Sequence, residues 1–199
     1  MNTTTIASPP LAPPGAGLPW PELQAARLMF GWLSWRASRA SAAALLAAEQ
    51  QAILALAESC DPASAVRPVL IDRLRGMEDS SRFWSVCMTL DHLRIVNLAV
   101  AETIETLGRG VVPPRAASTA AVKPSAQAGV EMLGEFARSC ELIAGTVAAV
   151  PDLRTPARYA HPWFGPLDAA HWHFMAGFHL RLHRAQIVAI LRGLAKGDR

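Results

Sequence analysis

Apolar residues recur every three or four positions along four stretches of the chain, which is the spacing of one face of an α-helix. The first stretch, residues 22–60, is rich in alanine and leucine and predicts either one long helix or two helices joined near residues 34–41. The other stretches cover about residues 83–107, 125–150 and 169–194. No stretch alternates with period two for long enough to predict a strand. The pattern therefore predicts an all-α four-helix bundle.

Residue types that favour helix ends support these limits. The candidates are Pro21 in the first turn of the first helix, residues 79–81, Ser125 and Asp168 as N-caps of the next three, Gly108 and Gly110 at the end of the second, and Pro151 after the third. Residues 112–124 contain three prolines and predict a surface loop or mobile hinge. Residues 151–167 are rich in proline and aromatic residues, and we expect this connection to be ordered because Trp163 and Phe164 favour burial.

Composition and charge argue against three classes of protein. The chain is 51% hydrophobic and 18% charged, which excludes a disordered protein. Its most apolar run, residues 41–57, carries Glu49, Gln50 and Gln51 in the middle, so we expect no membrane span. The net charge is +3, but the basic residues are scattered singly, so we expect no binding to nucleic acid.

The first twenty residues contain many prolines and neither a basic segment nor an apolar one, so we expect no signal peptide. We predict that residues 1–20 form a disordered Pro-rich tail and that residues 21–199 form one bundle domain. The three cysteines, Cys60, Cys87 and Cys140, lie far apart and without CxxC spacing. They predict reduced thiols and a cytoplasmic protein.

Four of the six histidines lie within residues 171–183 of the last predicted helix. His179 and His183 are one turn apart, so they share a face, and that face carries apolar neighbours and points to the core. His171 and His173 point elsewhere, and we expect them to lie in the first turn or on the surface. In the second helix, His92 lies on the face that carries small and apolar residues, so it also points inward.

Three inward-pointing imidazoles near the middle of two helices predict a facial three-nitrogen site for a divalent ion. The alternative is three core histidines that are hydrogen-bonded and bind no metal. A fourth ligand would have to come from Asp91, Glu131, Glu135 or His161, of which Asp91 is about 100° round its helix from His92. Gln186, one turn beyond His183, is a candidate to orient one of the metal ligands through a hydrogen bond.

The chain resembles the DinB/YfiT-like superfamily of metal-binding four-helix bundles over most of its length after the tail. The resemblance rests on Trp84-Ser85 followed by His92-Leu93, on His179-Leu180 with His183 and Gln186-Ile187, and on HPWFGPL at residues 161–167, which is similar to the HPxFGxL signature of one subgroup. It implies that His92, His179 and His183 bind nickel, zinc or iron. It also implies an S-transferase or isomerase activity with a small thiol, as in several relatives. An acidic residue often precedes the helix-two histidine by four in this superfamily, whereas Met88 stands there in this chain.

Two functions follow as hypotheses. The first is a metal-dependent thiol S-transferase or hydrolase in which an exogenous thiol or water takes an open position on the ion. Cys87 is about 140° round its helix from His92, so the nucleophile is expected from solution. The second is a non-catalytic metal-binding bundle that acts by dimerising or by binding a partner.

Two further side chains have two interpretations each. His161 and Trp163 either line the mouth of a pocket, or seal the bundle end and cap the backbone. Trp84 and Trp172 are expected to pack in the core. We also expect a homodimer that pairs through the alanine-rich first helical stretch.

Overall fold

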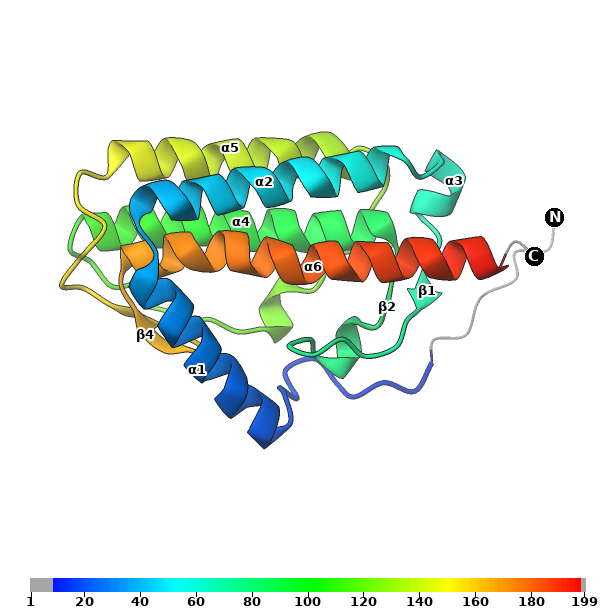
Figure 1. Ribbon diagram of the computed structural model, residues 1–199, viewed down its shortest axis with the longest axis horizontal. Helices are drawn as coiled ribbons and strands as arrows, with labels where there is room; N and C mark the ends of the chain where they lie inside the picture. Colours follow the sequence, from blue (N-terminus) through cyan, green and yellow to red (C-terminus); the bar gives the residue numbers. More distant parts are fainter. Residues whose placement is uncertain (1–8, 198–199) are drawn as a thin grey trace.

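Four long helices lie side by side in the computed structural model, which describes residues 9–197 (Figure 1). They are α2 (Arg39–Glu58), α4 (Val86–Gly108), α5 (Met132–Ala149) and α6 (Ala169–Gly197). Both α2 and α4 pack against α5 and α6, so the four helices surround one core. In Figure 1, α2 and α6 run in one direction and α4 and α5 run in the other. The predicted all-α four-helix bundle is confirmed.

The first helical stretch is two helices, as the second alternative predicted. The first of these, α1 (Trp20–Arg36), runs obliquely to the bundle and precedes α2 (Figure 1). Ala37 between them has extended backbone, and Ser38 caps α2 through reciprocal hydrogen bonds with Ser41. Phe30 anchors α1, because its buried ring stacks on Phe164 with centroids 4.2 Å apart.

Two predicted helix starts are wrong. Residues 79–81 form the 3-10 turn η1 (Asp79–Ser81), and the N-cap of α4 is Ser85, whose side chain accepts from the N–H of Met88. Ser125 does not begin α5, because its backbone N–H donates to Asp91 and its hydroxyl caps only a local turn at Gln127. The cap predicted for α6 is present, since Asp168 Oδ1 accepts from the N–H of His171 at 2.9 Å.

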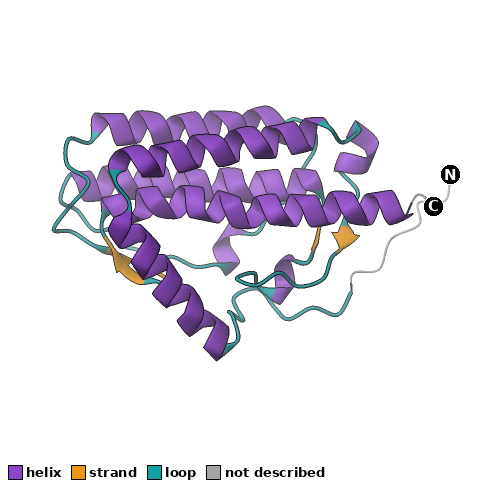
Figure 2. Cartoon of the chain, in the orientation of Figure 1, coloured by secondary structure: helices purple, strands orange, loops and turns teal. Residues whose placement is uncertain are grey.

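Four short strands contradict the expectation of none (Figure 2). Strand β1 (Val69–Leu70) pairs antiparallel with β2 (Phe83–Trp84), and β3 (Tyr159–His161) forms a hairpin with β4 (Gly165–Leu167). Strands of two or three residues are too short to show an alternating pattern, which is why sequence periodicity misses them. The chain also forms a one-turn helix α3 (Pro62–Ala65) and a 3-10 turn η2 (Ala120–Val122).

The predicted disorder of the Pro-rich tail is not confirmed. Residues 1–8 lie outside the described residues, and residues 9–19 form neither helix nor strand. The backbone N–H of Ala12 donates to Asp79 Oδ2 at 2.8 Å, and that of Gly15 donates to Glu78 Oε2 at 3.2 Å. These bonds hold this part of the tail against the connection that precedes α4.

Helix α2 is, among the described helices, the one long and apolar enough to cross a membrane by length and composition alone. A core helix of a soluble protein meets the same criterion, so this is weak evidence for a membrane span. In the structure α2 packs on α5 and α6 and buries Glu49. The Glu49 carboxylate accepts from Arg181 and Arg184 of α6, whereas only 28% of the apolar stretch of α2 is buried.

Candidate metal centre

The three predicted ligands converge between α4 and α6. His179 Nε2 lies 3.3 Å from His92 Nε2 and 3.1 Å from His183 Nε2. One ligand nitrogen from each residue lies within 4.8 Å of the other two. His92 and His183 are buried, and His179 is partly exposed. Helical periodicity places His179 and His183 one turn apart, and the antiparallel packing of α4 brings His92 to them.

Hydrogen bonds at the far side of two rings fix which nitrogen carries the proton. His92 Nδ1 lies 2.6 Å from the backbone carbonyl oxygen of Val122, and His183 Nδ1 lies 2.6 Å from Gln186 Oε1. An amide oxygen can only accept, so each Nδ1 is the N–H donor and each neutral ring keeps a bare lone pair on Nε2. The side-chain nitrogen of Gln186 donates to Ser81 O at 2.7 Å, which assigns the amide orientation.

Burial keeps all three rings neutral at physiological pH. It lowers the pKa of His92 to about 4, and it lowers the pKa of His179 and of His183 well below the ordinary value. Charge on the neighbouring histidines would lower the last two further. The lone pairs that a metal ion requires are therefore available at pH 7.

The donor set fits a divalent ion. Metal–nitrogen bonds of about 2.0–2.1 Å, at tetrahedral or octahedral angles, place ligand nitrogens about 2.9–3.4 Å apart, and the two distances from His179 Nε2 lie in that range. Without an ion, a hydrogen on His179 Nε2 could bond to the lone pair of either His92 Nε2 or His183 Nε2, but not to both. The lone pair of the other residue would then have no partner. His179 Nδ1 is itself buried without a hydrogen-bond partner in the described part of the chain. A cation satisfies all three lone pairs at once.

Residues 45–187 match the family model of the DinB superfamily. The chain belongs to the DinB superfamily. The chain is also similar to a solved structure described as "Crystal structure of TT2238, a four-helix bundle protein", at 25% sequence identity and a TM-score of 0.57. That likeness covers 76% of this chain and 99% of the other. No curated protein matches the chain. Membership in the subgroup with the HPxFGxL signature stays a prediction.

Trp84 forms one wall of this candidate metal centre. Its ring is stacked against His183 with centroids 6.1 Å apart and tilted against His92 at 5.0 Å. Both Trp84 and Trp172 are buried, as predicted for core packing. The Lys123 ammonium lies 5.4 Å from the centre of the Trp84 ring and donates to Glu78 Oε2 at 3.2 Å. Neither Lys123 nor the carbonyl of Val122 was predicted, because a lone lysine and a backbone group in a Pro-rich loop carry no periodic signal.

His161 is the last residue of β3, at the start of the turn to β4. Its Nδ1 accepts from the backbone N–H groups of Trp163 and Phe164 at 3.1 and 3.4 Å, and its ring stacks on Phe164. Burial lowers its pKa to about 4. Of the two interpretations, these contacts favour backbone capping for His161 and sealing of the bundle end for Trp163, whose carbonyl accepts from Arg27 of α1.

The other histidines of α6 lie apart from the centre. His171 Nδ1 lies 2.6 Å from Asp168 Oδ1 near the helix start. The expectation that His173 lies in the first turn or on the surface is wrong, because it is buried and only 1% exposed. Its face of α6 is covered by the start of α2, where Arg39 and Ala42 line the same cavity.

The proposed fourth ligands do not join the cluster among the described residues. Asp91 pairs with Arg94, Glu131 accepts from Gly129, and Glu135 pairs with Arg138. The buried thiols are also unsuited to catalysis. Burial raises the pKa of Cys87 to about 11 and that of Cys140 to about 12, so both are protonated at neutral pH.

Proposed function

We propose that this DinB protein is a metal-dependent thiol S-transferase or hydrolase, with nickel, zinc or iron held by His92, His179 and His183. The observation that supports the proposal best is the pair of Nδ1 hydrogen bonds, from His92 to Val122 and from His183 to Gln186, that leave bare Nε2 lone pairs aimed at one point. Three protein ligands favour an open site, since structural zinc usually has four.

A divalent ion at this site would lower the pKa of a small thiol or of water enough to supply a nucleophile near neutral pH. The chain's own residues hold the ligands and limit access. Val122 and Gln186 fix the rings of His92 and His183, and Trp84 covers one side of them. The nucleophile comes from solution, because burial keeps Cys87 and Cys140 protonated.

The second candidate is a non-catalytic metal-binding bundle that acts through dimerisation or a partner. One observation favours it: α1 exposes three tryptophans, Trp20, Trp32 and Trp35, each more than half accessible. A surface of this kind on a soluble protein is typical of an interaction site. We propose a homodimer in either case, working in the cytoplasm and binding neither membrane nor nucleic acid.

The deciding experiment uses protein purified without chelators or a polyhistidine tag. Metal analysis should find one divalent ion per chain. The cobalt- or nickel-loaded protein is then titrated with a small thiol and, separately, with cyanide while its visible spectrum is recorded. A saturable spectral change supports an open catalytic site, and no change with either ligand rejects it in favour of the non-catalytic bundle.

A further inference from the structure

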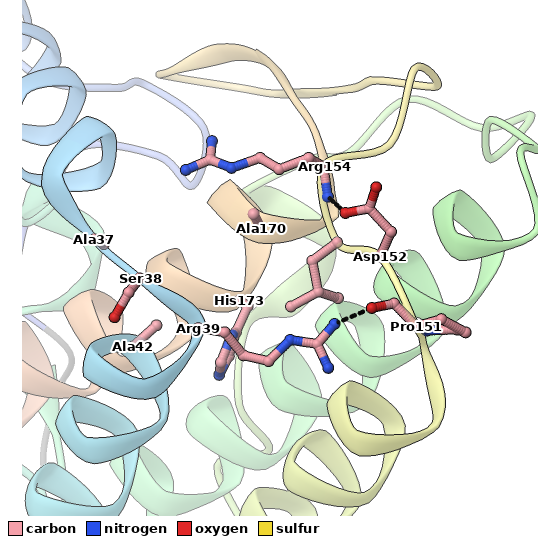
Figure 3. A pocket seen from close by; sticks show the side chains of 10 residues that line it. Ala37, Ser38, Arg39, Ala42, Pro151, Asp152, Arg154, Ala170 and His173 are labelled. Atoms are coloured by element: carbon pink, nitrogen blue, oxygen red, sulfur yellow. Dashed lines mark hydrogen bonds between the residues drawn. The ribbon is translucent and has the colours of Figure 1, made fainter.

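A cavity lies at the end of the bundle where α2 and α6 begin and α5 ends (Figure 3). Its volume is about 240 Å³, and its polar lining comes from Ser38, Arg39, Asp152, Arg154 and His173. His173 precedes His179 by six residues, which is about 9 Å along the helix and about 120° round it. The cavity is therefore separate from the metal centre.

His173 is the unusual member of this lining. The residue is 1% exposed, and its Nδ1 has no hydrogen-bond partner among the described residues. Buried polar atoms in proteins are nearly always paired, with protein, water or a ligand. Burial, followed by the charge of Arg39, lowers the pKa of His173 to about 4, so the neutral ring has one N–H to donate.

Arg39 brings a fixed positive charge to the same cavity. Its guanidinium donates to the carbonyls of Val147 at 3.3 Å and Val150 at 2.7 Å. It also donates to that of Pro151 at 2.9 Å (Figure 3). These bonds use three of its five N–H donors and hold the group in place. All three acceptors are neutral carbonyls at the end of α5. None of these hydrogen bonds therefore pairs Arg39 with a negative charge.

Two further features add positive potential. The 20-residue helix α2 begins at the cavity, and the positive end of its dipole points there. The Arg154 side chain is about half exposed, and its guanidinium lies 3.8 Å from Asp168 Oδ2, beyond hydrogen-bond distance. Asp152 is the acidic residue of the lining, and its Oδ1 accepts from the backbone N–H of Arg154 at 2.8 Å. Two guanidinium groups and one carboxylate thus line the cavity, and a second carboxylate, that of Asp168, lies beside Arg154 outside the lining.

We propose that this cavity binds a compact oxyanion, a carboxylate or phosphate group on a molecule of few non-hydrogen atoms. Arg154 and the remaining N–H groups of Arg39 donate to its oxygens, and the N–H of His173 donates from the buried side. The volume suits a small group, since pockets for drug-sized molecules span about 300–1,000 Å³. The site needs no metal, so the proposal stands apart from the proposed function.

The test is calorimetric titration of the full-length protein, as purified, with inorganic phosphate and separately with acetate at constant ionic strength. We expect saturable binding of one anion per chain, and the tighter of the two identifies the favoured group. Arg154→Gln should weaken binding at least about tenfold, because it removes charge-assisted hydrogen bonds. Arg158→Gln is the matched control, because Arg158 is exposed on the same connection and outside the cavity lining.

A second variant tests the buried donor. His173→Leu replaces the imidazole by an apolar side chain of similar volume, so it should fold while losing at least about tenfold in anion affinity. Absence of saturable binding with both anions overturns the proposal. Equal weakening by Arg154→Gln and Arg158→Gln also overturns it, because that result means general attraction to a basic surface. A folded His173→Leu protein that binds as tightly as the wild type overturns it as well.

Discussion

Gln186 accepts a hydrogen bond from Nδ1 of His183 at 2.6 Å, and its own amide nitrogen donates to Ser81 at 2.7 Å. The completely buried amide thus fixes the His183 ring from the side opposite the metal centre. Such partners of metal-binding histidines orient the ring and raise its basicity.

Gln186→Leu should therefore weaken metal binding about 10–100-fold, the usual effect of losing such a partner. Competition with a chromophoric chelator measures the affinity. Gln186→Glu keeps an acceptor for His183 and should retain more of the affinity than Gln186→Leu. Unchanged affinity in a folded Gln186→Leu protein would show that the amide does not support His183.

His179→Ala should abolish both bound metal and turnover. His179 is the central member of the cluster, within 3.3 Å of both other ligand nitrogens, so its removal leaves two histidines from different helices. Metal analysis of the purified variant should fall from one ion per chain to a small fraction. His171→Ala is the matched control, because His171 lies on the same helix and pairs with Asp168. Full metal stoichiometry in His179→Ala would contradict the three-histidine site.

Periodicity predicted that the three histidines face the core because each lies inside a long helix, where 3.6 residues per turn determine which side chains point inward. The same rule failed for His173. Periodicity shows on which face of the helix a residue lies, but it does not show which neighbouring element covers that face. At this end of the bundle α2 covers it, and α2 was not distinguishable from α1 by pattern alone.

Groups outside the helices could not be predicted in this way. Trp84 has helical spacing with the residues of α4, yet it lies in β2 because pairing with Val69 extends its backbone. Val122 supports His92 through a backbone carbonyl, which any residue could supply. Lys123 lies beside the centre only because the connection between α4 and α5 folds back over it.

The folded protein should lose stability as pH falls below about 6.5. Burial, followed by the charge of Arg39, lowers the pKa of His173 to about 4, whereas an unfolded histidine has a pKa of about 6.5. Above 6.5 both states are neutral, and below it the unfolded state binds a proton that the folded state does not. The stability is therefore fully present above 6.5 and falls by up to about 1.4 kcal/mol per pH unit for this residue until pH about 4.

His173→Leu isolates this contribution. The free energy of unfolding, measured by urea titration between pH 7 and 4.5 without phosphate or carboxylate buffers, should fall less steeply than in the wild type. It should also be equal or higher at pH 7, because the variant removes a buried, unpaired polar atom. Parallel curves for the two proteins would mean that His173 does not carry this acid sensitivity.

The exposed apolar face of α1 should join two copies of the chain. Trp20, Leu28, Trp32 and Trp35 are 72%, 77%, 59% and 74% exposed and fall within about 120° round the helix. Tryptophans of this exposure present roughly 400 Å² together, which is about half of what one partner contributes to a stable interface. The exposed alanines of α2, which follows α1 in the sequence, supply further apolar surface.

We expect the wild type to be a dimer at micromolar concentration by size-exclusion chromatography with light scattering. The double variant Trp32→Ser/Trp35→Ser should be monomeric with its metal content unchanged, because these residues lie outside the metal centre. Leu142→Ser is the matched control, because Leu142 is an exposed apolar residue of α5, and this variant should stay dimeric. A monomeric wild type would exclude pairing through α1, whereas a dimeric double variant would place the interface elsewhere on the bundle.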